Sequence, residues 1–233
     1  FECLHGLGHA GMFITDTDVP ASLKLCDTLG SADNKERCYS GVFMENSSSS
    51  TSNDHPGKYI KADDPMYPCN SLEEKYLQLC YRYQSSYFAL ITRHDWAAVA
   101  NLCLKVPPQY QQDCFRTVGT NQVGFTQDFH LMKADCEAMP QQFKDACFGG
   151  VIGSLSYRFV GDMTKMVEFC TLLESPNQPN CVKNIGSSIV DWQKDASTQQ
   201  HLCQQTGNSQ FIDWCQQGLA SVQNRLGKNQ VFN

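Results

Sequence analysis

The stretch that decides the fold is Asp128–Tyr157, DFHLMKADCEAMPQQFKDACFGGVIGSLSY. A first helix is predicted to begin at Asp128, because an aspartate side chain accepts hydrogen bonds from the free N–H groups of a first turn. It should end before Pro140, whose ring cannot continue a helix, and a second helix should follow. One cysteine lies on each helix, Cys136 and Cys147. The stretch therefore predicts a helical hairpin with a cysteine on each arm.

The same plan recurs along the chain at a nearly constant spacing. The first cysteines of successive pairs lie 43, 34, 33, 34 and 33 residues apart. A period near 34 with two helical segments is typical of helical hairpins stacked into a solenoid. We therefore expect an all-α fold, an α-solenoid of stacked hairpins with a period of about 33–34 residues. It should form a single domain over residues 1–225, followed by a flexible tail over residues 226–233.

Two disulfide registers fit the cysteine spacings. The first closes each hairpin on itself, and we favour it because a bridge across a short turn needs less packing between repeats. Its pairs are Cys26–Cys38, Cys69–Cys80, Cys103–Cys114, Cys136–Cys147, Cys170–Cys181 and Cys203–Cys215. The second is shifted, joins Cys3 to Cys26 and so on, and leaves Cys215 over. In the first register Cys3 is the second cysteine of a unit whose first half is absent.

In general plan, this pattern of cysteines and helices resembles the disulfide-stapled relatives of the tetratricopeptide-repeat proteins. The resemblance implies a solenoid of helical hairpins. The period here is shorter than in the cysteine-rich members, the cysteines of a pair are farther apart, and the glycine signatures are missing. The resemblance therefore implies an architecture and no function.

Composition limits the compartment and the partners. Thirteen cysteines in 233 residues predict an oxidising compartment, so we expect an extracellular, cell-surface or periplasmic protein. The net charge of −6 argues against nucleic acid or an anionic membrane surface as the main partner. No apolar run approaches the ~20 residues of a membrane span. Because the chain begins at Phe1, we also expect that a leader, an anchor or an upstream segment has been removed.

The repeat fails between residues 46 and 68, NSSSSTSNDHPGKYIKADDPMYP. The serine, asparagine, glycine and proline content predicts an irregular surface loop in place of a first helix. In the next helix, Gln84 occupies the position where the other units carry an aliphatic residue. Gly6 and Gly8 match glycines of other units and are predicted to allow close packing of helices.

The first repeat of the chain carries the strongest candidate site, FECLHGLGHA. His5 and His9 are four residues apart, so on a helix they share one face and can bind one transition metal. The next second helix should bring Glu45 within reach, and His55 follows in the irregular loop. The expected cofactor is one zinc ion, or a copper ion if Met12 and Met44 contribute.

The opposite interpretation is that His5 and His9 are ordinary polar helix residues and Glu45 is a surface carboxylate. The positions equivalent to His5 in other units are polar and vary, which is typical of the binding face of a solenoid. Arg82, Arg116 and Lys183 occupy three of them. They predict either a groove for an anionic or peptide ligand or a row of solvated charges.

Three functions are consistent with this pattern. The first is an exported helical-repeat binding or scaffold protein that recognises a protein, peptide or glycan, with a metal at its N-terminal end. The second is a metal-dependent enzyme that uses His5, His9 and Glu45. The third is a subunit of an extracellular assembly that self-associates through its uncapped N-terminal end.

Overall fold

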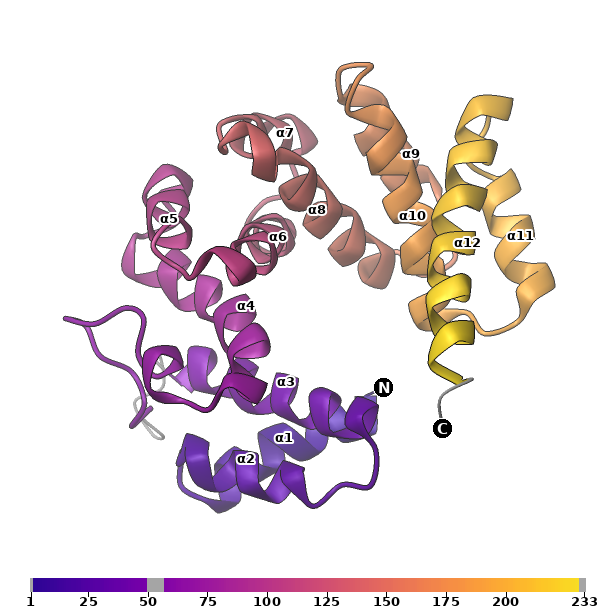
Figure 1. Ribbon diagram of the computed structural model, residues 1–233. Helices are drawn as coiled ribbons and strands as arrows, with labels where there is room; N and C mark the ends of the chain where they lie inside the picture. The colour runs from indigo at the N-terminus through magenta and orange to yellow at the C-terminus, as the bar shows by residue number, and fades with distance from the viewer. Residues whose placement is uncertain (1, 50–56, 231–233) are drawn as a thin grey trace. The chain divides into compact units, whose positions relative to one another are not determined.

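The computed structural model describes residues 2–49 and 57–230, and in these ranges all regular secondary structure is helical (Figure 1). The prediction of an all-α protein is therefore confirmed. The helices are α1 Glu2–Ile14, α2 Val19–Asp27, α3 Ala32–Ser49, α4 Glu74–Ile91, α5 Trp96–Cys103, α6 Pro108–Phe125, α7 Phe129–Glu137, α8 Lys144–Arg158, α9 Thr164–Leu172, α10 Gln178–Trp192, α11 Ala196–Gln204 and α12 Ser209–Gln230. Two single turns of 3₁₀ helix, η1 Cys69–Ser71 and η2 Gln141–Phe143, precede α4 and α8.

Each hairpin is closed by its own disulfide, as the favoured register predicts. The six bridges join residues 11 or 12 apart, and their Cα atoms lie 5.5 to 5.7 Å from each other. Each closes a short loop and stabilises the fold by roughly 2–4 kcal/mol through restriction of the unfolded chain. Cys3 remains as an exposed free thiol.

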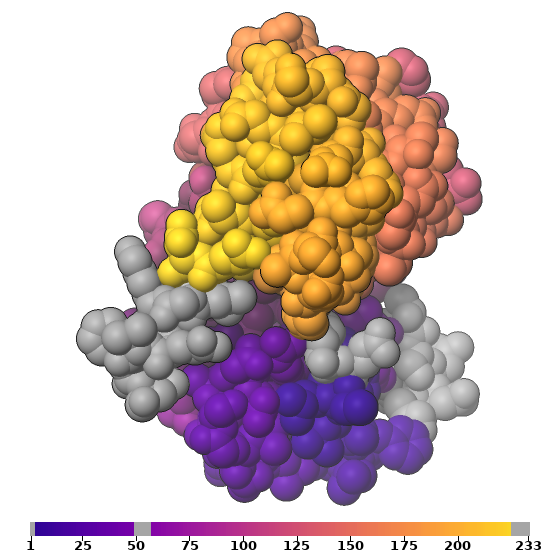
Figure 2. All heavy atoms as spheres, turned by 90° about the vertical axis from the view of Figure 1, so that its right-hand side faces the viewer, coloured from indigo at the N-terminus to yellow at the C-terminus, as the bar shows by residue number. Residues whose placement is uncertain are grey.

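The chain divides into two compact units, Phe1–Val118 and Gly119–Asn233. In the first unit the long helices α1, α3 and α4 pack side by side, while the short helices α2 and α5 pack against them (Figure 1). In the second unit α8, α10 and α12 form the corresponding row, with α7, α9 and α11 beside them. Figure 2 shows the surface that α11 and α12 contribute to this unit. The last helix continues past residue 225, so the predicted tail is helical as far as Gln230.

Carboxylates begin most of the short helices, as predicted. The N-cap residues that accept a hydrogen bond from the first turn are Asp18, Asp95, Asp128 and Asp195. The start of α9 differs by one residue, because its N-cap is Met163. Even there, the Asp162 carboxylate accepts a hydrogen bond of 2.8 Å from the backbone N–H of Thr164. The start predicted at Asp128 is therefore confirmed, and an aspartate at the equivalent position begins the other four helices to within a residue.

The helices α1 and α3 cross at a pair of glycines. A Cβ atom added at Gly8 would lie 2.1 Å from the carbonyl oxygen of Cys38, and one added at Gly41 would lie 2.0 Å from that of His5. Because no side chain fits there, glycine lets the two backbones touch. Gly6 is different, since an added Cβ would meet nothing within 4 Å. Its predicted packing role is therefore wrong: no described helix lies against that side of α1.

The second unit repeats this crossing. A Cβ atom added at Gly186 of α10 or at Gly218 of α12 would lie 1.9 Å from a carbonyl oxygen of the facing helix. Gly119 of α6 makes the same contact with α8. Close backbone contact is thus a recurring way of joining neighbouring repeats.

Residues 57–68 occupy the place of a first helix without forming one. Their backbone carbonyls need donors, and Gln84 supplies two hydrogen bonds, of 2.8 Å to Pro65 and 2.9 Å to Tyr67. This explains why Gln84 replaces the aliphatic residue of the other units. The irregular part starts later than predicted, because α3 continues from residue 46 to Ser49.

Two findings bear on the compartment. The six disulfides indicate an oxidising environment, extracellular or periplasmic. None of the described helices combines the length and the apolar character needed to cross a bilayer.

Candidate functional site

The predicted histidine pair lies where α1 crosses α3. His5 and His9 lie one turn apart on α1, and Ser40 and Glu45 face them from α3. The crossing at Gly8 presses the two backbones together, so the side chains beside it meet directly.

Each histidine ring is held through its Nδ1 atom. His9 Nδ1 lies 2.7 Å from Oε2 of Glu45, and His5 Nδ1 lies 2.7 Å from the hydroxyl oxygen of Ser40. The two Nε2 atoms face each other at 3.1 Å, and the rings meet edge to face with centroids 4.9 Å apart. Both histidines are half-buried, so the pair is open to solvent on one side.

The hydrogen bonds determine the tautomer of each ring. The Ser40 hydroxyl donates its hydrogen to the backbone carbonyl of Arg37 at 2.6 Å, so it can only accept from His5. The Glu45 carboxylate likewise only accepts, so His9 donates from Nδ1. With both Nδ1 atoms protonated, the two Nε2 atoms of the neutral rings carry lone pairs that point at each other.

Such an arrangement calls for a cation between the nitrogens. One such cation is a proton held on His9 and donated from its Nε2 to that of His5, with Glu45 balancing the charge; burial and the nearby charge of His9 hold the pKa of His5 itself below its ordinary value. A metal ion is the other: with metal–nitrogen distances of about 2.0–2.1 Å, a separation of 3.1 Å corresponds to an angle of about 100° at the metal. Linear two-coordinate copper(I) would need the nitrogens about 4 Å apart.

The structure places Glu45 at the Nδ1 atom of His9, away from the facing Nε2 atoms. A carboxylate that accepts the outer N–H of a ligating histidine fixes its orientation and raises its basicity. Among the described residues, no cluster of three or more histidine, cysteine, aspartate or glutamate side chains is arranged to hold a metal. The two Nε2 atoms would therefore bind the ion, and its other positions would be open to water or to a bound ligand.

The remaining predicted ligands lie in different surroundings. His55 lies outside the described residues. Met12 is fully buried, whereas Met44 is 44 % exposed.

The three predicted partner-face cations lie on three different helices. Arg82 forms an ion pair with Asp113, with 2.7 Å between Nη2 and Oδ1, so its charge is neutralised within the first unit. Arg116 is exposed on α6. Lys183 is half-buried on α10, in the second unit.

Sequence reasoning missed one member of the site, Ser40. A signal for it exists, because Ser40 occupies the same repeat position on α3 that His5 occupies on α1. Because α1 and α3 touch at Gly8 and Gly41, the side chains of His5 and Ser40 beside the crossing come into contact.

The chain matches no protein-family model, no curated protein and no solved structure. Its function must therefore be inferred from the chemistry of its own residues.

Proposed function

We propose that the protein is an exported helical-repeat binding protein that holds one transition-metal ion between His5 and His9. The observation that supports this proposal is the facing pair of Nε2 atoms 3.1 Å apart, each on a ring whose Nδ1 atom is already hydrogen-bonded. Imidazole nitrogens are common ligands for zinc and copper(II), and the angle of about 100° suits both.

The metal ion would bind a partner molecule together with the protein. Two protein ligands leave further coordination positions vacant, and a donor group of a protein, peptide or glycan partner could fill them. Ser40 and Glu45 hold the rings in the binding tautomer before the metal arrives, which reduces the entropy lost on binding.

The test is metal binding by the full chain. Elemental analysis of protein purified without chelator or affinity metal should find about one zinc or copper ion per chain, and calorimetric titration with Zn²⁺ should give the same stoichiometry. The double variant His5→Ala/His9→Ala should bind none at this site. Equal metal content in the wild type and the double variant would refute the proposal.

Glu45 provides a sharper test of the geometry. Glu45→Gln should keep the stoichiometry but lower the Zn²⁺ affinity by about 10- to 100-fold, because the residue orients His9 without touching the metal. Glu36→Gln is the matched control: it removes an exposed carboxylate from the same helix and should leave the affinity unchanged. Loss of stoichiometric binding in Glu45→Gln would instead make Glu45 a direct ligand.

A specific observation also favours a second candidate function, that of an assembly subunit. The α1 residues Cys3, Leu7, Ala10 and Ile14 are exposed and follow one another at helical spacing, so they form an apolar stripe along the helix. Exposed apolar stripes of this kind mark association surfaces.

A further inference from the structure

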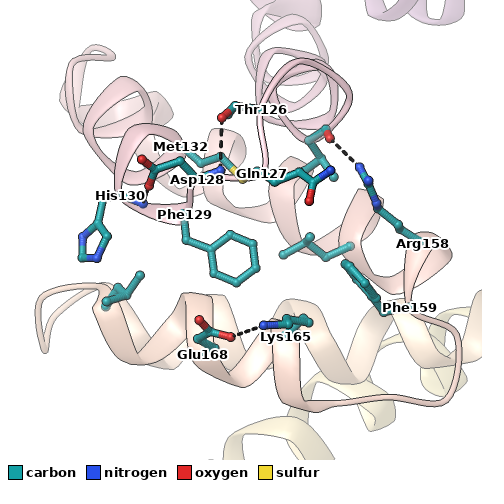
Figure 3. A pocket seen from close by; sticks show the side chains of 13 residues that line it. Thr126, Gln127, Asp128, Phe129, His130, Met132, Arg158, Phe159, Lys165 and Glu168 are labelled. Carbon is teal, nitrogen blue, oxygen red and sulfur yellow. Dashed lines mark hydrogen bonds and ion pairs between the residues drawn. The ribbon is translucent and has the colours of Figure 1, made fainter.

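The second unit contains a cavity of about 320 Å³ bordered by α7, α9 and the C-terminal ends of α6 and α8 (Figure 3). Its floor is apolar and rigid, because Val123, Met132 and Leu155 are each at least 97 % buried. The volume lies at the small end of the range for ligand-binding pockets.

Aromatic rings form two of its sides. Figure 3 shows Phe129 pointing into the space and Phe159 on the other side of it. Both rings are only half-buried, as is Leu172 of α9. A ligand with an apolar body would cover these surfaces, which are now in contact with water, and gain hydrophobic stabilisation.

The cavity also carries one charge that the protein does not neutralise. The Arg158 guanidinium donates to the backbone carbonyl of Val123, with 3.1 Å between Nη1 and oxygen. Among the described residues no carboxylate lies within ion-pair distance of Arg158. Arg158 is also exposed, so its charge is open to an anionic ligand.

The other charged groups of the cavity already have partners. Lys165 pairs with Glu168, with 2.8 Å between Nζ and Oε2. The Asp128 carboxylate caps α7 by accepting the N–H of His130 at 2.8 Å. Arg158 is therefore the group that an ionic ligand would meet.

We propose that this cavity binds a small apolar carboxylate, with its carboxylate on Arg158 and its body between Phe129 and Phe159. The planar guanidinium presents parallel N–H donors that match the two oxygens of a carboxylate. The same chemistry has two sources: a free fatty or aryl carboxylic acid, and the C-terminus of a peptide that ends in an apolar residue. This site is independent of the metal site, so either proposal can fail alone.

The first experiment compares octanoate with its neutral counterpart octanamide by calorimetric titration of the full chain. Octanoate should bind at least about 10-fold more tightly, because a hydrogen-bonded charge pair adds to the apolar contact. Arg158→Gln should reduce the octanoate affinity by about 10- to 100-fold and leave the octanamide affinity unchanged. Arg116→Gln, which removes an exposed arginine of the first unit, is the matched control and should change neither.

A second variant separates a binding effect from a folding effect. Phe129→Ala should weaken octanoate and octanamide alike, while thermal unfolding shows that the helices remain folded. Equal affinities of the wild type for octanoate and octanamide would overturn the proposal. So would an Arg158→Gln variant with wild-type affinity, or no octanoate binding up to about 5 mM.

The tripeptide Ala-Ala-Phe and its C-terminal amide distinguish the two sources. Tighter binding of the tripeptide acid than of both octanoate and the amide would identify a peptide C-terminus as the ligand. Tighter binding of octanoate than of the tripeptide acid would identify a free carboxylic acid.

Discussion

Asp27, the last residue of α2, connects three helices of the first unit through its carboxylate. It accepts hydrogen bonds from Tyr39 of α3, from Tyr76 of α4 at 2.6 Å and from Lys75 of α4 at 3.0 Å. Burial by itself raises the pKa of Asp27, but the hydrogen bonds from the tyrosines and the charge of Lys75 outweigh it. The pKa of this carboxyl therefore lies below its ordinary value.

This lowered pKa makes stability depend on pH. The folded state favours the ionised carboxylate, so the unfolded chain binds the proton more tightly. The stabilisation from Asp27 is present above the unfolded pKa of about 3.9 and is lost as the pH falls through the lower, folded pKa. We predict that Asp27→Asn lowers the free energy of unfolding by about 1–2 kcal/mol at pH 7 and that its difference from the wild type shrinks at pH 3.

Urea denaturation at both pH values measures this difference. Asp33→Asn is the matched control, because Asp33 is an exposed carboxylate paired with Arg37 one turn away, and it should cost less than about 0.5 kcal/mol. An Asp27→Asn variant that stays equally far below the wild type at pH 7 and pH 3 would contradict this account.

The histidine pair shows what the spacing of residues in the sequence can predict about a site and what it cannot. Four residues between His5 and His9 predict that both rings lie on one face of a helix, and the repeat predicts that Glu45 lies nearby. Spacing cannot predict which nitrogen each ring presents, because that depends on Ser40 and Glu45 accepting from the Nδ1 atoms. Arg158 left no sequence signal, since a lone arginine at the end of a helix looks like any surface charge.

At the scale of helices, one rule explains where neighbours cross most closely. The glycine five residues after the cysteine of one long helix faces the glycine three residues after that of the next, as with Gly8 and Gly41 or Gly186 and Gly218. In α3 and α4 the same positions hold Phe43 and Tyr83, which leave no room for such a crossing. The sequence contained this rule, but only the contacts show which glycines face each other.

The close crossing of α1 and α3 predicts opposite changes in stability for two glycine substitutions on α1. Gly8→Ala should lower the free energy of unfolding by at least about 2 kcal/mol, because the new Cβ would overlap the carbonyl oxygen of Cys38. Gly6→Ala, two residues away on the same helix, has open space and should raise it by about 0.5–1 kcal/mol through better helix propensity.

Chemical denaturation of the oxidised protein measures both changes. Gly8→Ala should also weaken Zn²⁺ binding, because the same crossing brings His5 to Ser40, whereas Gly6→Ala should keep it. Similar stabilities for the two variants would show that α1 and α3 can separate without cost.

For the irregular segment, the sequence predicted that a helix is missing but not how the remaining backbone is hydrogen-bonded. The missing first helix was evident from composition, and Gln84 was evident as an odd residue. Their connection was not, because a glutamine donating to two backbone carbonyls looks in sequence like any polar substitution.

At the scale of the whole chain, the repeat period does not reveal how the hairpins group. The cysteine spacing continues unchanged through α6, where the boundary between the two compact units lies. A period reports the chain length of each hairpin, whereas grouping depends on how many contacts each interface makes. For this reason the sequence alone predicted one domain over residues 1–225.

The apolar stripe on α1 leads to a prediction about the molecule in solution. Leu7 is 45 % exposed and Ile14 is 75 % exposed, and neighbouring Phe13 is 69 % exposed. Covering such side chains removes apolar surface from water, which favours association through this helix. Sedimentation velocity of a Cys3→Ser background, which excludes disulfide-linked dimers, should show concentration-dependent association.

Adding Leu7→Glu and Ile14→Glu to this background should abolish the association, because burying two carboxylates in an apolar contact is costly. Leu104→Glu, at a comparably exposed leucine on the end of α5, should leave association intact. A monomer at every concentration would show that this face does not join two copies, and would leave a different partner as its occupant.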